Sequence, residues 1–163
     1  MIRDLNVTSQ PGLSWLKGVL AGFLGTIPMT VFMLATQRFL PHGQRYALPP
    51  EIITKELAHR AKVKQHMSKM QILAVTLISH FAYGAAMGGL YSLSGMQGRR
   101  SSLAKGGLFG FIVWVGSYFG LLPILGMTEA GQREPLRRNM MMMVAHLIWG
   151  SAMGLLAEIL IRE

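Results

Sequence analysis

The stretch MQILAVTLISHFAYGAAMGGLYSLSGMQG, residues 70–98, contains no Asp, Glu, Lys or Arg. Lys69 and Arg99 flank these 29 uncharged residues. A helix rises about 1.5 Å per residue, so the stretch is long enough to cross a hydrocarbon core about 30 Å thick. It therefore predicts a transmembrane helix.

Three further uncharged runs surround this stretch, at residues 18–37, 106–128 and 139–157. Only 14% of the 163 residues are charged, whereas an average soluble domain has about 25%. The chain is therefore expected to be an all-α membrane protein. Its four transmembrane helices are predicted at roughly Trp15–Leu34, Gln71–Leu93, Gly106–Met127 and Met140–Ile161. Two of them contain an internal proline, Pro28 and Pro123, which usually bends a helix.

The two halves of the chain are similar to each other. Residues 17–24 and 105–112 are identical at five of eight positions. Residues 80–90 and 146–156 are identical at six of eleven. The similarity predicts that a hairpin of two helices has been duplicated.

The duplication predicts a single membrane domain over residues 1–163, with repeat one at 15–95 and repeat two at 104–161. Each repeat crosses the membrane twice, so both enter it in the same direction. Parallel repeats of this kind are related by an axis along the membrane normal.

Each predicted span carries two glycines four residues apart. Residues at this spacing share one face of a helix. Small residues on such a face let two helices approach closely, and van der Waals contact then drives their association in lipid. We therefore expect the helices to pack through Gly18, Gly22, Gly84, Gly88, Gly106, Gly110, Gly150 and Gly154.

His80 and His146 occupy equivalent positions in the two repeats. A histidine within a membrane span marks a candidate functional site, because a polar ring is costly in hydrocarbon. Parallel repeats place both rings at one depth, facing the interior of the bundle. We favour hydrogen bonding to a neighbouring helix, with no cofactor. Ligation of haem, a chlorophyll-type pigment or a metal ion is the alternative.

Two other clusters are not expected to form sites. Consecutive residues of the Met140–Met143 run point about 100° apart on a helix, so they cannot converge on one ion. They are expected to face lipid or the core, with Met141 on a loosely packed face. A solvated, charged connection is expected at Glu129, Arg133, Glu134, Arg137 and Arg138.

The connection between the first two spans contains Pro49 and Pro50 followed by Glu51, which is typical of a helix start. Apolar residues then recur at helical spacing as far as about Lys64. Glu51–Lys55 and Glu56–Arg60 form i,i+4 pairs of opposite charge. The pattern predicts a basic amphipathic helix within an insert at 49–64. Such a helix usually lies on the membrane surface, and a docking surface for a partner is the alternative.

The chain has 16 Lys and Arg but 7 Asp and Glu, a net charge of +9. The basic residues flank the spans, so we expect them to contact anionic lipid headgroups and not nucleic acid. Ten of them fall in the two connections within repeats, which are therefore expected in the cytoplasm with both termini outside. The absence of cysteine excludes disulfides, iron–sulfur clusters and thiol catalysis.

Four segments resemble the YagU-like family of small bacterial inner-membrane proteins of unknown function: Tyr46–Glu51, His80–Gly84, Trp114–Pro123 and Ala145–Gly150. The resemblance covers most of the chain. It implies a multi-pass protein of the bacterial cytoplasmic membrane. It implies no reaction and no catalytic residues.

The sequence contains no nucleophile–base pair, phosphate-binding loop, zinc spacing or paired carboxylates. We therefore predict a non-catalytic membrane protein that acts as an accessory or assembly subunit of a larger membrane complex, or as a homo-oligomeric packing module. Its partners would be the lipid bilayer and other membrane subunits or itself. A haem- or pigment-binding redox subunit using His80 and His146 is the first alternative, and a small permease is the second.

Overall fold

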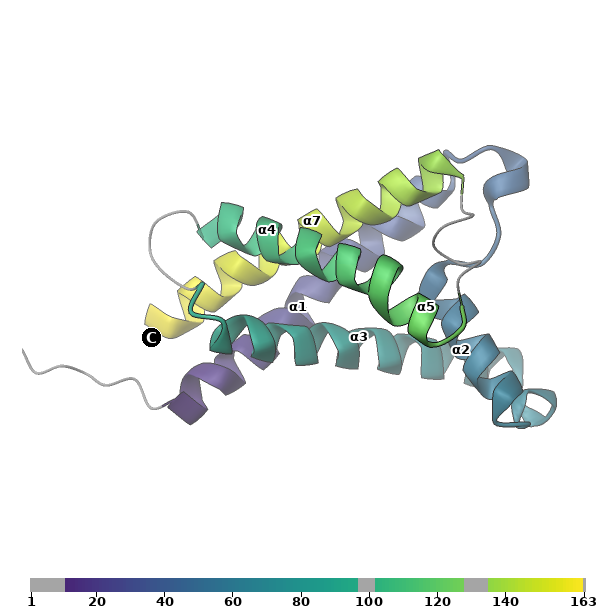
Figure 1. Ribbon diagram of the computed structural model, residues 1–163, viewed down its shortest axis with the longest axis horizontal. Coiled ribbons are helices and arrows are strands. Elements are labelled where there is room, and N and C mark those ends of the chain that lie inside the picture. The colour runs from purple at the N-terminus through teal and green to yellow at the C-terminus, as the bar shows by residue number, and fades with distance from the viewer. Residues whose placement is uncertain (1–10, 97–101, 128–134, 163) are drawn as a thin grey trace, which may run out of the picture.

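The computed structural model describes residues 11–96, 102–127 and 135–162, and in these ranges all regular structure is helical (Figure 1). This confirms the all-α prediction. Three long helices are α1 (Pro11–Gln37), α3 (Lys69–Leu93) and α7 (Leu136–Arg162). A fourth helical stretch consists of α4 (Ser102–Val115), the π-helical segment η3 (Gly116–Leu121) and α5 (Leu122–Ile124). The first connection contains α2 (Pro49–Arg60) and the 3-10 turns η1 (His42–Gln44) and η2 (Lys64–His66).

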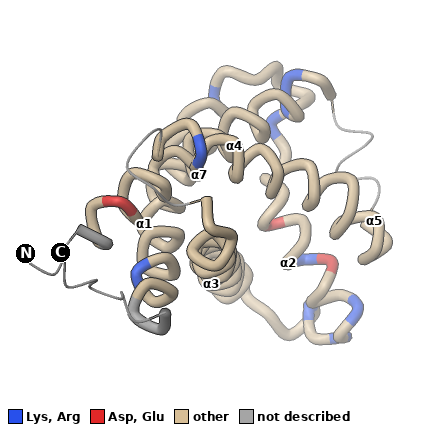
Figure 2. Tube along the Cα trace, turned by 60° about the vertical axis from the view of Figure 1, so that its left-hand side comes forward, with Lys and Arg blue, Asp and Glu red and all other residues tan. Residues whose placement is uncertain are grey.

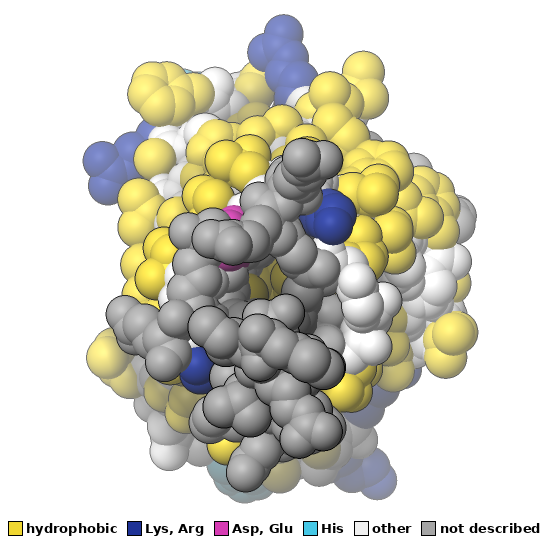
Figure 3. All heavy atoms as spheres, turned by 90° about the vertical axis from the view of Figure 1, so that its left-hand side faces the viewer, with side chains coloured by type: hydrophobic (Ala, Val, Ile, Leu, Met, Phe, Trp, Pro, Cys, Tyr) yellow, Lys and Arg dark blue, Asp and Glu magenta, His cyan; other side chains and the backbone are white. Residues whose placement is uncertain are grey.

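Four helical stretches are long and apolar enough to cross a membrane, at Ser14–Gln37, Lys69–Leu93, Ser102–Ile124 and Leu136–Leu160. They coincide with the four predicted spans, and together they indicate a multi-pass membrane protein. Figure 3 shows the molecule from the end at which α1 begins and α7 ends. Hydrophobic side chains cover the flanks of the molecule around this end. Each stretch begins earlier than predicted, because a basic or polar residue is compatible with the end of a span.

The helices follow the spatial order α3, α1, α7, α4. α1 packs on both α3 and α7, and α7 packs on both α1 and α4 (Figure 1). α1 and α7 are therefore the central helices, and α3 and α4 are the edge helices. The two hairpin connections lie at one end of the bundle. Most of the Lys and Arg residues in the described part of the chain also lie at this end (Figure 2).

The closest helix crossings are made by the predicted glycines, all eight of which are buried. A Cβ atom added to Gly88 of α3 would lie 2.7 Å from the Cα of Gly22 in α1. A Cβ added to Gly150 of α7 would lie 2.8 Å from the Cα of Gly110 in α4. Neither separation leaves room for a side chain. Both hairpins thus cross through glycines, but Gly150 aligns with Gly84 and not with Gly88, so the two crossings differ by one turn.

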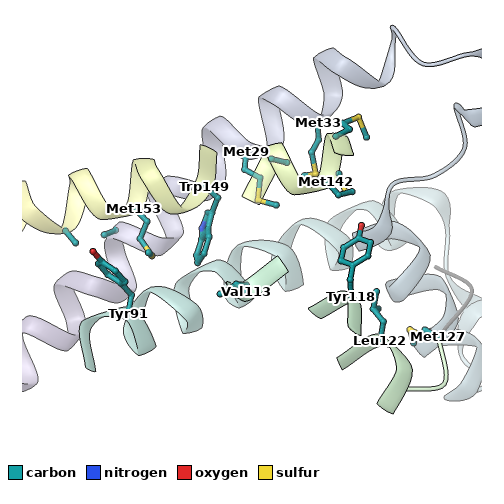
Figure 4. Close-up of a cluster of buried hydrophobic side chains, with 14 of the residues drawn as sticks. Met29, Met33, Tyr91, Val113, Tyr118, Leu122, Met127, Met142, Trp149 and Met153 are labelled. Carbon is teal, nitrogen blue, oxygen red and sulfur yellow. The ribbon is translucent and has the colours of Figure 1, made fainter. Parts of the chain in front are cut away.

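Methionine and aromatic side chains fill the space between the central helices. Met29 and Met33 of α1 lie near Met142 of α7, with Trp149 one layer further along (Figure 4). Met141 is 7% exposed, so the expectation of a loosely packed face at this residue is wrong. The physical reason is that α7 has neighbours on two sides.

The third span does not contain a simple bend at Pro123. A π-helical segment, Gly116–Leu121, precedes this proline. Proline lacks an N–H for the carbonyl four residues earlier and also crowds it, and a wider turn relieves that conflict. The π segment lies beside the site described below.

Arg138 was expected in a solvated turn, but it is fully buried near the start of α7. Its guanidinium donates hydrogen bonds to the carbonyl oxygens of Gln44 at 2.9 Å and Ala47 at 2.9 Å. It also donates to the carbonyl of Tyr46 and stacks on that ring, 3.7 Å from the centroid. The long first connection folds over α7, and its turns leave carbonyls that a helix would have satisfied. Glu129, Arg133 and Glu134 lie outside the described residues.

The helix expected at Glu51–Lys64 ends at Arg60, and Lys62 after it has a positive φ of 58°. Both expected ion pairs, Glu51–Lys55 and Glu56–Arg60, are present. The apolar face of α2 is turned toward the protein: Ile53 packs against the hydrophobic core. The position of α2 at a membrane surface remains a prediction.

Candidate functional site

A cavity of about 290 Å³ lies between α1, α3, η3 and α7. α2 contributes Pro49, Ile53 and Leu57 to its wall, so this helix covers one side of the space. The wall is mostly apolar, with Met29, Met33, Val113, Leu122 and Met142 among its members. An apolar space with a few polar groups is the usual form of a binding site for a small molecule.

The two hairpins differ beside the cavity. Gly25 of α1 lies so close to α7 that an added Cβ would be 3.2 Å from the backbone nitrogen of Met153. In the offset that aligns residues 17–24 with 105–112, the position equivalent to Gly25 is Val113 of α4. Val113 lines the cavity, and α3 and α4 share no packing face comparable to that between α1 and α7. Val113 therefore lies in the wall of this space, whereas Gly25 lies at a close contact between α1 and α7.

The cavity wall carries no formal charge, because it contains no Asp, Glu, Lys or Arg. Among the described residues there is also no group of three or more His, Cys, Asp or Glu that could hold a metal ion. The wall therefore favours a neutral occupant.

His80 and His146 both line this cavity, from α3 and α7 respectively. The structure thus brings the two predicted residues to one site. Met87 and Met153 are not part of the wall.

Each histidine was expected to form a hydrogen bond with a neighbouring helix, but the described part of the chain shows neither bond. His146 Nδ1 lies 2.8 Å from the carbonyl oxygen of Met142, which belongs to its own helix. His80 Nε2 is buried and has no hydrogen-bond partner in the described part of the chain. The carbonyl one turn before His80 belongs to Thr76, and it accepts a hydrogen bond from Ser79 at 3.1 Å. The two residues at aligned positions thus differ in their described hydrogen bonds.

The other polar side chains of the wall are engaged with the protein. Thr26 Oγ1 and Trp149 Nε1 both donate to the carbonyl oxygen of Gly22, at 2.9 Å and 3.1 Å. The hydroxyls of Tyr83 and Ser117 are 3.0 Å apart and link α3 to η3. The role of Ser117 was not predicted, since nothing in the sequence distinguishes it from other span serines.

Arg60 holds α2 over the cavity. Its guanidinium donates to the carbonyl oxygen of Leu125, just after α5, and to Glu56 at 2.8 Å. The second of these hydrogen bonds holds the pKa of Glu56 below its usual value. α2 is therefore tied to the end of the third span through one side chain.

These features define an all-helical, multi-pass membrane protein with a neutral cavity between its spans. The chain belongs to the family described as a protein of unknown function, DUF1440, whose model matches residues 29–155. The matched region includes both histidines. No curated protein and no solved structure matches the chain.

Proposed function

We propose that this chain is a non-catalytic protein of the bacterial cytoplasmic membrane that binds a small, neutral, largely apolar molecule between its helices. The observation that carries the proposal is the cavity itself, lined by apolar side chains from four spans and by two histidines. The bacterial location rests on the resemblance to YagU-like proteins.

The size of the cavity supports a small ligand. An engineered protein cavity of about 150 Å³ binds benzene, and the present space of about 290 Å³ is roughly twice as large. A molecule with one or two rings, or a short hydrocarbon chain, matches that volume. Haem contains four pyrrole rings and would protrude from it, so we rank the haem-binding redox role second although two histidines are present.

An accessory or assembly role in a larger complex, or self-association, is compatible with this proposal. Its support is that the edge helices α3 and α4 each pack on one central helix of the chain, which leaves their outer faces for lipid, other subunits or a second copy. A small permease has less support, because a neutral and mostly apolar wall offers no aqueous path for a charged solute.

The test is to purify the protein in a mild detergent, extract it with organic solvent and identify the extracted molecules by mass spectrometry. A matched sample of Val113→Trp, which fills the cavity, is the control. We expect a neutral small molecule that is depleted at least tenfold in the control. Identical extracts from the two proteins would contradict the proposal, and a Soret absorption band in the purified protein would favour the haem alternative.

A further inference from the structure

His80 and His146 keep hydrogen-bonding capacity within the cavity. Thr26, Ser79 and Trp149 donate to backbone carbonyls, and Tyr83 and Ser117 bond to each other. A polar group on a ligand in this space would therefore interact with His80 or His146.

The contact of His146 with Met142 defines which ring nitrogen can accept a hydrogen bond. A carbonyl oxygen can only accept, so the Nδ1 atom 2.8 Å from it must carry the proton. A neutral imidazole has one protonated and one unprotonated nitrogen. The neutral ring is favoured within a membrane span, because a charge there is costly. His146 Nε2 is therefore an acceptor, and it requires a donor from the ligand.

His80 provides a second unsatisfied group on the opposite helix. A buried polar atom without a partner is uncommon in proteins and calls for an explanation, such as a ligand or an ordered water. Its Nε2 atom is such an atom. A group that both donates and accepts could bond to His146 and also come near His80.

We propose, on the basis of the proposed function, that the cavity recognises a neutral alcohol or phenol from the membrane, whose hydroxyl donates a hydrogen bond to His146 Nε2 and whose hydrocarbon part contacts Met29, Met33 and Leu122. A hydroxyl is the smallest neutral group that donates and accepts at the same atom. An ionised group is excluded by the uncharged wall. His80 lines the same space from α3.

Three bromobenzenes test the role of the hydroxyl. 4-Bromophenol can donate a hydrogen bond, 4-bromoanisole has an oxygen that can only accept, and bromobenzene has neither. Bromine quenches tryptophan fluorescence at short range, and Trp149 lines the cavity. The protein would be Trp15→Phe/Trp114→Phe in lipid nanodiscs, so that Trp149 is its one tryptophan. Each affinity is corrected for the membrane partition of its probe.

We expect 4-bromophenol to bind about threefold to tenfold more tightly than 4-bromoanisole, the range of one net hydrogen bond. His146→Phe should abolish this preference and leave bromobenzene binding within twofold. His146→Gln should retain part of it, because its amide oxygen can accept. His59→Phe, on the exposed side of α2, is the matched control and should behave like the parent.

Equal binding of the phenol and the anisole by the parent protein would overturn the hydroxyl inference and leave the proposed function standing. A preference that survives in both folded His146 variants would overturn the role of this residue. If none of the probes quenches Trp149 more than it quenches a tryptophan ester in protein-free nanodiscs, both the inference and the proposed function are wrong. Folding of each variant is checked by its melting temperature.

Discussion

α3 and α7 carry the same motif in different surroundings. His80, Tyr83 and Gly84 of α3 correspond to His146, Trp149 and Gly150 of α7. Trp149 is 2% exposed, whereas Tyr83 is 37% exposed. α7 packs between α1 and α4, but α3 packs on α1 at the edge of the row. The motif therefore contributes to the cavity wall from both helices, but its aromatic residue is buried in α7 and exposed in α3.

The two hairpins are similar in sequence and each has a glycine crossing, but they differ in one further contact. Gly25 brings α1 against Trp149 and Met153, and Val113 stands at the aligned position in α4. In a pseudo-symmetric bundle with glycine at both aligned positions, α4 would pack on α3 as closely as α1 packs on α7. A larger residue on one side leaves a space, which is a simple way to derive a binding cavity from a repeated hairpin.

The largest expected effect is at the aromatic pair. Trp149→Ala should lower the free energy of unfolding by about 3–5 kcal/mol, because it empties a fully packed position. Tyr83→Ala should cost about 1–2 kcal/mol, since this side chain is partly exposed and loses one hydrogen bond and part of its packing. Unfolding in mixed micelles with increasing SDS would measure both. Similar losses would show that the two motifs have equivalent surroundings.

The starts of α7 and α3 should also differ in how much they contribute to the free energy of unfolding. Arg138→Ala should lower the free energy of unfolding by about 3 kcal/mol, because buried carbonyls of the first connection lose their donor. Arg137→Ala is the matched control, since this neighbour is exposed, and should change little. At the start of α3, Ser68→Ala removes a capping box and should cost about 1 kcal/mol. Equal effects of the two arginine variants would contradict the anchoring role of Arg138.

Substituting a glycine of the α7 crossing should likewise cost more stability than substituting a glycine of the α3 crossing. A Cβ at Gly150 would meet the backbone of Gly106 and Gly110, which cannot move aside. Gly150→Leu should therefore cost about 3 kcal/mol. At Gly84 the nearest atom is the side-chain oxygen of Thr26, which can rotate, so Gly84→Leu should cost about 1–2 kcal/mol. Met140→Leu on the exposed side of α7 is the control. Equal melting temperatures for all three would disprove packing through these glycines.

Much of this fold could be predicted from the sequence because its signals are local. Uncharged runs define the spans, and glycine spacing indicates the contact faces. Features that depend on which helices become neighbours were not predictable. The burial of Met141 requires α7 to be central, and the burial of Arg138 requires the first connection to fold over it. The π segment before Pro123 depends on a local conflict that a different bend could also have relieved.

The candidate site was predicted in part. The duplicated histidines pointed to the interior, and both line the cavity. The expected hydrogen bond from His146 to a neighbouring helix was wrong, because its Nδ1 atom lies within reach of a carbonyl oxygen of its own helix. The cavity itself depends on a space between helices that are distant in sequence, and no residue pattern reports such a space directly.

The smallest expected effect concerns the link between the edge helix and the cavity wall. The Tyr83–Ser117 hydrogen bond joins α3 to η3, and these elements share little other packing. Tyr83→Phe should cost only about 0.5–1 kcal/mol in stability, the net value of one hydrogen bond. It should nevertheless widen the distribution of distances between α3 and η3, because the direct polar link between them is lost.

The chain has no cysteine, so spin labels can be placed on single introduced cysteines without further changes. Ile78 of α3 and Phe119 of η3 are 69% and 56% exposed and would accept labels on their outward faces. Electron–electron double resonance should give a broader distance distribution for Tyr83→Phe and for Ser117→Ala. The double variant should be no broader than either one, because both changes remove the same bond. Additive broadening would mean that the two hydroxyls act independently, and α3 would then be held at the cavity by contacts other than this pair.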